Sequence, residues 1–210
     1  GVNCFFIDEY SVKRKKGSVG MPMPFSTINL TDLDKKHIIE GEGEGVMWFK
    51  GLVLFNGYEN IPNKETFDNF LGFCSGDIAY RDNEGFYWIR GRIKDMIIRG
   101  GENIYPIEIE KEVYENSKIE ECSLFGVEDN YWGEIPILAL KFKNEVAKDD
   151  YELEVESIIN QLKKNLASYK IPHFVMILDL LPKTTTGKIS KNDLVNLYYN
   201  KNFLKLIKIK

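Results

Sequence analysis

The sequence has few of the residues that build disulfide frameworks, metal sites and membrane spans. Its 210 residues include three cysteines, Cys4, Cys74 and Cys122, and two histidines. Because the cysteines are odd in number and far apart, they favour reduced intracellular thiols over a disulfide framework. No CxxC motif or histidine pair accompanies them, so no residue is expected to bind a metal. No run of about 18 apolar residues occurs, and a transmembrane segment is therefore not expected.

An excess of charge of one sign is also absent. The net charge is −4, with 29% charged and 43% hydrophobic residues. This composition argues against a disordered tail and against binding to nucleic acid, and the length allows one or two globular domains with a real core. The short basic run at residues 13–16 is interpreted as a solvated loop.

The start of the sequence shows no targeting signal. The first residue is Gly1 rather than methionine, and no basic stretch followed by an apolar one comes after it. Any targeting segment would therefore lie upstream. Together with the cysteine usage, this predicts an intracellular protein, cytoplasmic or organellar.

The first part of the chain has the pattern of short strands. Apolar runs broken by glycine and proline, such as residues 45–51 and 86–89, have the length and the boundaries of strands. Between them, Pro62 and the polar residues after it predict a short helix through Phe70.

After Arg92 the pattern changes to alternating helices and strands. Pro106 suits the first turn of a helix that ends near Ser117. Apolar residues at helical spacing over 155–166 predict an amphipathic helix that packs on a sheet and is stopped by Pro172. Further elements are expected as strands at 122–125, 137–142 and 173–178 and as a helix at 194–198.

These patterns divide the chain near Lys94. Residues 1–93 are predicted to form a β-rich part, and residues 94–200 a compact α+β part. Residues 201–210 are predicted to be a frayed tail. The fold class is therefore expected to be α+β.

Asp77 is a candidate ligand for a ribose. It follows Gly76 at the start of an apolar strand, and a carboxylate accepts two hydrogen bonds from a diol. Taken alone, a Ser-Gly-Asp turn is more often structural than functional. The functional interpretation is strengthened by the next 15 residues, which contain a strand, an acidic turn with glycine, and a second strand that ends in Gly91 and Arg92.

Lys188 is the candidate catalytic residue. It ends the sequence Pro-Lys-Thr-Thr-Thr-Gly-Lys at residues 182–188, a turn that can place an ammonium group at a developing phosphorane. A phosphate-binding P-loop needs glycine where Pro182 stands and serine or threonine where Ile189 stands, so that alternative is excluded. By residue type alone, Lys188 would be an ordinary surface lysine.

Three segments together resemble the adenylate-forming superfamily of acyl-CoA synthetases, peptide-synthetase adenylation domains and beetle luciferases. They are residues 74–77, residues 91–106 with their Gly-Gly-Glu-Asn-Ile-Tyr-Pro sequence, and residues 182–188. The resemblance implies that the β-rich part is the end of a large AMP-binding domain and that residues 94–200 are its small mobile lid. The glycine segment most resembles that of acyl-CoA synthetases.

The resemblance also implies a role for each candidate residue. Asp77 and Arg92 would hold the ribose of ATP, and Lys188 would bind ATP and act in catalysis. Lys94 would be the hinge about which the lid rotates. The residues implied to line the path of CoA are Arg99, Gly100 and Gly101.

The activity implied is that of an acyl-CoA synthetase. A carboxylic acid, of the fatty-acid kind, would react with Mg-ATP to give an acyl-adenylate and pyrophosphate, and the thiol of CoA would then displace AMP. ATP, Mg²⁺ and CoA are therefore the expected cofactors. The 210 residues alone are expected to be inactive, because the family's phosphate loop is not among them.

Two alternative functions stay open. An adenylation domain would pass its acyl group to a carrier-protein thiol, and a degenerate homologue would be a non-catalytic, lid-derived binding domain. The joint presence of Asp77, Arg92 and Lys188 argues against the second alternative. The acyl group and the oligomeric state are not readable from the sequence.

Three further features are interpreted without a chemical role. His37 and His173 each lack a neighbouring carboxylate or nucleophile in the sequence, and lone histidines of this kind are rarely catalytic. Residues 129–134, which contain a Trp-Gly-Glu sequence, are interpreted as a packing segment.

Overall fold

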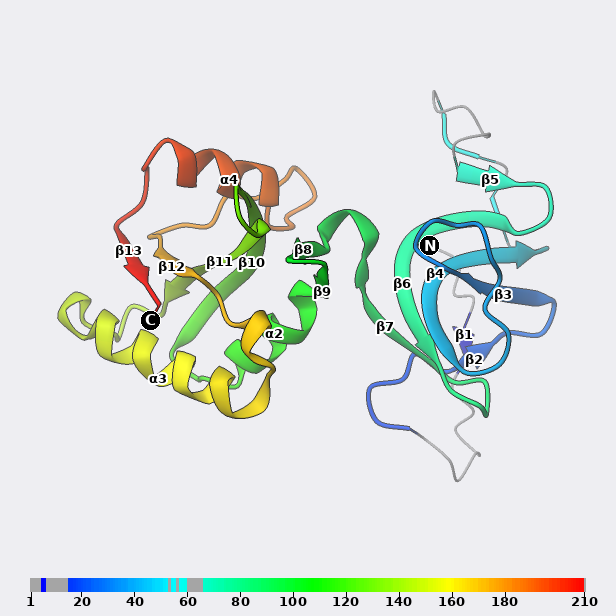
Figure 1. The fold of residues 1–210 in the computed structure, drawn as a ribbon, viewed down its shortest axis with the longest axis horizontal. Coiled ribbons are helices and arrows are strands. Elements are labelled where there is room, and N and C mark those ends of the chain that lie inside the picture. The colour runs from blue at the N-terminus through cyan, green and yellow to red at the C-terminus, as the bar shows by residue number, and fades with distance from the viewer. Residues whose placement is uncertain (1–4, 7–14, 53, 56, 60–65, 210) are drawn as a thin grey trace. The chain divides into compact units, whose positions relative to one another are not determined.

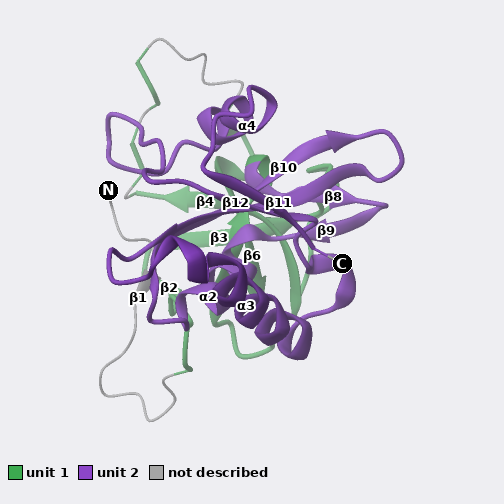
Figure 2. Cartoon of the chain, turned by 90° about the vertical axis from the view of Figure 1, so that its left-hand side faces the viewer, with its two compact units in different colours: residues 1–94 green, residues 95–210 purple. Residues whose placement is uncertain are grey.

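The computed structural model describes residues 5–6, 15–52, 54–55, 57–59 and 66–209. The chain divides into two compact units, residues 1–94 and residues 95–210 (Figure 2). Cys4 and the start of the helix predicted from Pro62 lie outside the described residues.

Unit 1 is built on an antiparallel sheet with the strand order β3-β4-β6-β5, in which β7 also pairs with β6. The strands predicted at 45–51 and 86–89 are present within β4 and at the start of β7. The strands are β1 (Phe5–Phe6), β2 (Met21–Pro22), β3 (Ser26–Thr31), β4 (Gly43–Gly51), β5 (Phe67–Asp68), β6 (Gly72–Arg81) and β7 (Tyr87–Arg92). β1 and β2 form a separate two-stranded pair.

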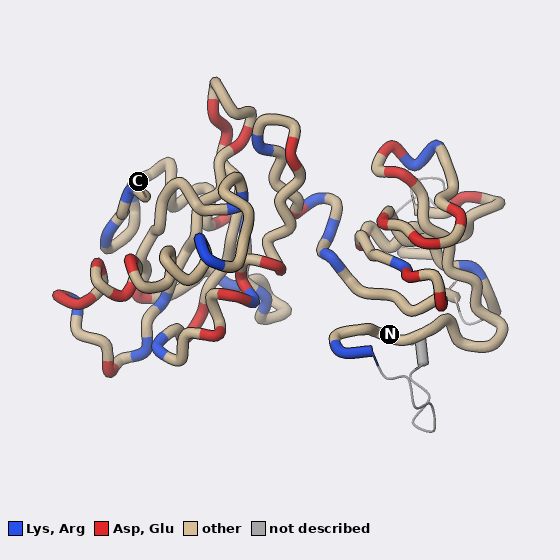
Figure 3. The backbone as a smooth tube through the Cα atoms, turned by 60° about the horizontal axis from the view of Figure 1, so that its bottom comes forward, with Lys and Arg blue, Asp and Glu red and all other residues tan. Residues whose placement is uncertain are grey.

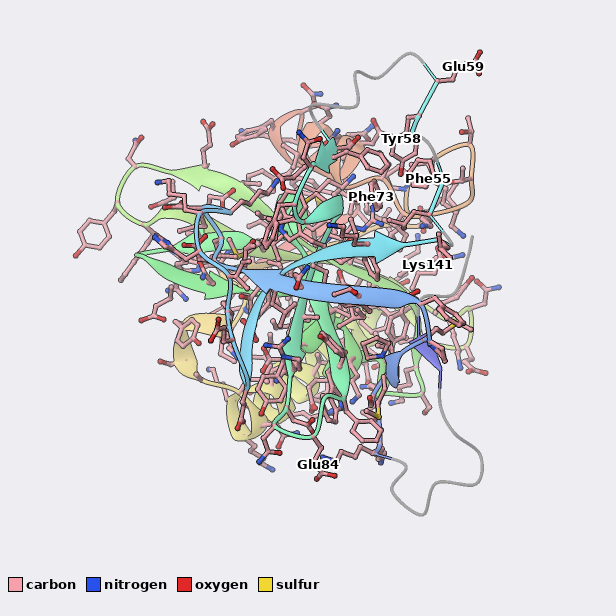
Figure 4. The ribbon with its side chains drawn as sticks, turned by 90° about the vertical axis from the view of Figure 1, so that its right-hand side faces the viewer. Phe55, Tyr58, Glu59, Phe73, Glu84 and Lys141 are labelled. Atoms are coloured by element: carbon pink, nitrogen blue, oxygen red, sulfur yellow. The ribbon has the colours of Figure 1, made fainter. Side chains whose placement is uncertain are left out.

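Two apolar groups stabilise this unit. Ile28, Leu30, Met47, Ala79 and Tyr87 form the buried core on one side of the sheet. A second, more exposed group consists of aromatic rings in edge-to-face or tilted contact, with ring centres 4.9 to 5.6 Å apart (Figure 4). Its members are Phe55, Tyr58, Phe67 and Phe73.

The helix predicted to run through Phe70 does not reach that residue. Phe67 and Asp68 form strand β5, which pairs with β6 opposite Phe73 and Gly72. Asp68 then accepts hydrogen bonds from the backbone N–H groups of Phe70 and Leu71, at 2.7 and 2.8 Å. A carboxylate that caps the next backbone groups in this way favours a turn over continued helix, so the prediction was wrong here.

Unit 2 contains a six-stranded mixed sheet of order β13-β12-β11-β8-β9, with β10 also paired to β11. β11 and β12 run parallel and are connected through helix α3, whereas β10–β11 and β12–β13 are antiparallel. The strands are β8 (Ile97–Arg99), β9 (Glu102–Ile104), β10 (Ile119–Asp129), β11 (Gly133–Phe142), β12 (Phe174–Ile177) and β13 (Lys205–Lys208). The helices are α2 (Pro106–Tyr114), α3 (Tyr151–Asn165) and α4 (Lys191–Tyr199), with short 3₁₀ turns at Ile93–Asp95, Lys148–Asp150 and Ser168–Lys170.

Helices cover both faces of this sheet. Side chains alternate along β11, so that Leu138 and Leu140 join the core formed with α2 and α3, whereas Ile137 and Ala139 join the core formed with α4. Figure 1 shows α3 and α4 on opposite sides of strands β10 to β12. The amphipathic helix predicted over 155–166 is therefore present and packs on a sheet, as the spacing of its apolar residues indicated.

Helix ends and the C-terminal segment differ from the sequence predictions. Helix α2 ends at Tyr114, three residues before Ser117. Helix α3 ends at Asn165, and Leu166 is already extended with φ −124° and ψ 155°, so Pro172 does not stop it. The frayed tail predicted after residue 200 was also wrong. Residues Lys205–Lys208 form β13 and pair antiparallel with β12, because Leu206 and Ile207 pack against the two cores on opposite faces of the sheet.

Charged residues of both signs are interspersed along the described parts of both units (Figure 3). None of the helices in the described part of the chain has the length and apolar character needed to cross a membrane. Cys74 and Cys122 are free thiols, and Cys122 is buried. Burial raises the pKa of the Cys122 thiol to about 12, with a smaller contribution from the charge of Glu110.

Candidate functional site

Asp77 and Arg92 form a cross-strand ion pair in unit 1. They lie directly opposite each other on β6 and β7, and Arg92 Nε donates a hydrogen bond of 2.9 Å to Asp77 Oδ1. Their side chains are 26% and 49% exposed, so the pair is open to a ligand. The two residues that the sequence assigned to a ribose are therefore brought together.

An extra residue in β7 makes this alignment. Ala79 pairs with Ile89 but Ile78 pairs with Gly91, which leaves Arg90 as a β-bulge. Without the bulge, Gly91 would lie opposite Asp77, and Arg92 would point to the other face of the sheet. On the Asp77 side, its backbone N–H donates to Ser75 Oγ at 3.0 Å, which fixes the turn before the carboxylate.

The Gly100–Gly101 pair forms a tight turn between β8 and β9 in unit 2. Arg99 pairs with Glu102, and the two glycines have φ angles of 58° and 88°. Two consecutive positive φ angles define the type I′ turn that suits a two-residue hairpin and favours glycine. A Cβ on Gly100 would lie 3.0 Å from the ring of Trp132, whereas a Cβ on Gly101 would meet no atom within 4 Å.

Arg99 is held by the groups around it. Its Nη1 donates to the carbonyl of Tyr169 at 2.7 Å, and its guanidinium lies 4.9 Å from the centre of the Trp132 ring. Its Nη2 lies 3.4 Å from His173 Nε2. Burial lowers the pKa of Arg99, but an arginine stays charged at neutral pH.

A pocket of about 370 Å³ opens beside Arg99. Burial, and then the charge of Arg99, lower the pKa of His173, which also faces the pocket. His173 could not be connected with Arg99 from the sequence, because 74 residues separate them and the fold brings them together. The pocket is lined by Arg99, Lys163, Leu166, Ser168, Ile171, Pro172, His173 and Ile209.

Trp132 belongs to the segment predicted to serve packing, and its contacts explain why the segment is needed. Asp129 Oδ1 accepts hydrogen bonds from the N–H groups of Tyr131 and Trp132, which shapes the β10–β11 hairpin. The carbonyl of Trp132 accepts from the N–H of Gly100 at 2.7 Å. The hairpin therefore supports the glycine turn as well as the Arg99 side chain.

Lys188 lies on a closed loop before α4. Lys183 and Ile189 form a β-bridge at its neck, and the N–H of Thr184 donates to the carbonyl of Lys188 at 2.7 Å. Gly187 has a φ of 81°, which lets the chain turn immediately before the lysine. The backbone of this loop is therefore hydrogen-bonded, and the freedom of Lys188 lies in its exposed side chain.

The two lysines that flank this loop are both engaged in ion pairs. Lys183 Nζ lies 2.5 Å from Glu121 Oε1, and Lys191 Nζ lies 3.8 Å from Glu110 Oε1. Burial lowers the pKa of Lys191, which is the first residue of α4. Lys188 forms no ion pair with any residue that the structure describes.

Lys94 lies in the 3₁₀ turn Ile93–Asp95, at the point where the two units divide. Its side chain is exposed and makes no ion pair within the described part of the chain. This placement is compatible with a hinge, which needs backbone freedom and a side chain that anchors neither unit.

The candidate residues thus form separate groups. Asp77 with Arg92 belong to unit 1, whereas residues 99–101 and Lys188 lie on different loops of unit 2.

His37 is exposed and pairs with Asp32 at 2.8 Å. Among the residues that the structure describes, no three His, Cys, Asp or Glu side chains cluster closely enough to hold a metal.

Comparison with known proteins assigns a family to unit 2. Residues 108–188 match the AMP-binding enzyme C-terminal domain, and this range ends on Lys188. The class that the fold and the loop of Lys188 define is therefore the C-terminal domain of AMP-binding enzymes.

Individual relatives extend the likeness into unit 1. An oxalate–CoA ligase of Saccharomyces cerevisiae is 40% identical over 184 residues, which cover 85% of this chain and 32% of the relative. A long-chain-fatty-acid–CoA ligase of Mycobacterium tuberculosis is 36% identical over 187 residues, covering 88% and 35%. The chain spans about a third of the length of the curated relatives it matches.

Solved structures give the same result. The o-succinylbenzoate CoA synthetase of Bacillus subtilis, in complex with its acyl-adenylate intermediate, matches with a TM-score of 0.76 and 32% identity. The match covers 86% of this chain and 36% of that one. The same enzyme has also been solved with ATP and a magnesium ion. The chain belongs to the adenylate-forming superfamily.

Proposed function

We propose that this chain supplies the ribose-binding pair, the hinge and the mobile lid of an AMP-forming CoA ligase. The enzyme would activate a carboxylic acid with ATP and transfer the acyl group to CoA. The observation that carries the proposal is the state of the Lys188 loop, in which Lys183 and Lys191 are paired and Lys188 is left exposed. An unpaired ammonium on an ordered loop is available to a substrate anion.

Asp77 and Arg92 are suited to binding the ribose of ATP. Arg92 Nε engages only one carboxylate oxygen of Asp77, and Asp77 Oδ2 is left to accept from a ribose hydroxyl. The remaining N–H groups of Arg92 are donors that the hydroxyl oxygens can accept from. Hydrogen bonds from a diol to a carboxylate are charge-assisted and therefore stronger than those to a neutral acceptor.

Lys188 would act in the adenylation step. When a carboxylate attacks the α-phosphate of ATP, negative charge accumulates on the phosphorus oxygens in the transition state. The Lys188 ammonium would bridge the acyl carboxylate and the α-phosphate and offset this charge. Magnesium would accompany the phosphates of ATP, in keeping with the o-succinylbenzoate CoA synthetase solved with both.

The glycine turn and Arg99 would serve the second step, in which CoA displaces AMP. A turn without side chains leaves room for the narrow pantetheine arm, and the charge of Arg99 favours the phosphates of CoA. We propose Lys94 as the hinge that allows the lid to rotate between the steps.

A carboxylic acid is the substrate class that the relatives share. Their names specify oxalate, long-chain fatty acids and o-succinylbenzoate, which differ in size and charge. A fatty acid is the substrate we propose for this chain. The test is ATP–pyrophosphate exchange with a panel of dicarboxylic, aromatic and fatty acids.

The exchange assay should be run on the product of the whole gene and on the 210-residue chain. We expect exchange with at least one acid in the first case and none in the second, because the chain spans about a third of its relatives. No exchange with any acid by the whole gene product would contradict the proposed activity. Comparing CoA with a carrier protein as the acceptor would separate a CoA ligase from a carrier-loading enzyme.

A further inference from the structure

We propose that Glu121 is a positioning residue for Lys188, acting through its ion pair with Lys183. The inference rests on the proposed role of Lys188. It concerns the neck of the loop, where Lys183 forms the β-bridge with Ile189. Because Lys188 directly precedes Ile189, any shift of the Lys183 backbone moves the catalytic residue as well.

The side chain of Glu121 is positioned by the strand that carries it. Glu121 lies within β10, where it pairs with Lys141 of β11 just after a register shift at Glu120, and its side chain is only 20% exposed. Its Oε2 atom is buried without a hydrogen-bond partner among the described residues. A partly buried carboxylate with one buried oxygen is less stable without a counter-charge, which favours the ion pair with Lys183.

Among the described residues, the ion pair of Glu121 is with Lys183 and not with the lysine on the neighbouring strand. Lys141 lies directly opposite Glu121 in the β10–β11 register, but its Nζ donates to Glu120 at 2.6 Å. This hydrogen bond is the main cause that raises the pKa of Lys141, and the charge of Glu121 contributes less. Lys183 Nζ lies 2.5 Å from Glu121 Oε1. The ion pair between Lys183 and Glu121 therefore joins the loop to the sheet at its neck.

The other end of the loop is tied separately. Ser190 caps α4 by accepting from the N–H of Asp193, and Lys191 faces Glu110 of α2. Glu110 Oε1 also accepts from the N–H of Leu124 at 2.8 Å. With α4 anchored on one side, the Glu121–Lys183 pair decides how rigid the other side of the Lys188 loop is.

The first test measures the loop directly in the 210-residue chain. Amide hydrogen exchange at Thr184 and Gly187 reports the hydrogen bonds that close the loop. Lys183→Met and Glu121→Gln are expected to speed this exchange about fivefold, and the double variant no further than either single one. Lys183→Arg, which keeps the charge, is expected to restore the wild-type rate.

A matched ion pair elsewhere in unit 2 provides the control. Lys118 lies 2.5 Å from Glu154, a carboxylate that is 12% exposed. Lys118→Met removes a similar pair and should leave exchange at Thr184 and Gly187 unchanged. An unchanged rate in Lys183→Met, or an equal acceleration in Lys118→Met, would overturn the inference.

The second test separates positioning from stability in the whole gene product. Lys183→Met is expected to lower kcat for adenylation about fivefold, with the KM for ATP and the thiolysis of supplied acyl-adenylate within twofold of wild type. Equal loss of both half-reactions would count against a positioning role. If the wild type catalyses no adenylation, the proposed function fails, and the exchange rates still decide whether Glu121 orders the loop.

Discussion

Arg92 faces Asp77 only because Arg90 is an extra residue in β7. The bulge shifts the register by one position between Ala79 and Ile78, and the ion pair of 2.9 Å forms just beyond it. Local irregularity in a strand thus creates a polar pair on one face of the sheet. Substitution of this pair and of the other site residues tests what each of them does.

Asp77→Ala should weaken nucleotide binding by the whole gene product. Loss of a charged acceptor for the ribose hydroxyls is expected to raise the KM for ATP about tenfold. Glu44→Ala is the matched control, because Glu44 pairs with Arg90 on the same sheet at 3.2 Å without a proposed ligand. Equal KM values for wild type and Asp77→Ala would rule out the ribose role.

Lys188→Ala should separate the two half-reactions. Adenylation is expected to fall about 100-fold or more, because the positive charge at the transition state is lost. Thioester formation from supplied acyl-adenylate should stay near the wild-type rate. Lys143→Ala, at an exposed lysine outside the loop, should affect neither step. A parallel loss of both steps would contradict the assignment.

Gly100→Ala should destabilise unit 2 more than Gly101→Ala. Both positions have positive φ angles, which cost an alanine about 1 to 2 kcal/mol. Only at Gly100 does the new Cβ also meet the Trp132 ring, at 3.0 Å, for a further cost of about 1 kcal/mol. Urea unfolding of the two variants measures the difference. Equal destabilisation would show that the Trp132 ring moves away from the new methyl group at little cost.

His173 should make stability depend on pH. Its pKa in the folded chain lies below the usual value, chiefly through burial and then through the charge of Arg99, with Lys208 acting in the same direction and Asp129 opposing. The unfolded chain therefore binds more protons near its pKa of about 6.5, and the His173 contribution is fully present above that pH and is lost as the pH falls through the folded pKa. Melting temperatures between pH 5 and 8 should fall towards the acid end, and less steeply in His173→Gln. Identical slopes would contradict this origin.

Strand β13 should contribute measurably to unit 2. Ile207→Asp places a charge among the apolar residues that Ile207 packs against, at an expected cost of about 2 to 3 kcal/mol. Lys208→Ala, at the exposed next position of the strand, should change stability by less than about 0.5 kcal/mol. Chemical unfolding would measure the two changes in stability. An Ile207→Asp variant as stable as the wild type would show that β13 does not contribute to the stability of unit 2.

The sequence predicted the elements and the motifs better than their ends and pairings. Helix α3 was predicted correctly because its apolar residues recur at helical spacing. Its end at Asn165 was not, because it depends on Leu166, which leaves the helical conformation and packs against the core. The apolar residue Leu206 and the β-branched Ile207 were a usable signal for β13, but the lysines around them suggested a solvated tail. Such cases depend on which face a neighbouring element offers, which a single segment does not encode.

The candidate site shows the same division. Asp77, Arg92 and Lys188 were identified through the ordered motifs that contain them and not by residue type, and the structure places Asp77 against Arg92. The bulge at Arg90 and the contact between His173 and Arg99 could not be predicted, since both arise from strand register and sheet order. The Glu121–Lys183 pair likewise joins residues that only the fold brings together.

The Gly100–Gly101 turn has no side chains of its own. The surface of the turn is therefore formed by its backbone atoms. Trp132 fills the space beneath Gly100 and leaves Gly101 open, which makes one side of the turn firm and the other free. In the proposed path of CoA, an alanine at Gly101 would therefore add a methyl group where the structure leaves open space.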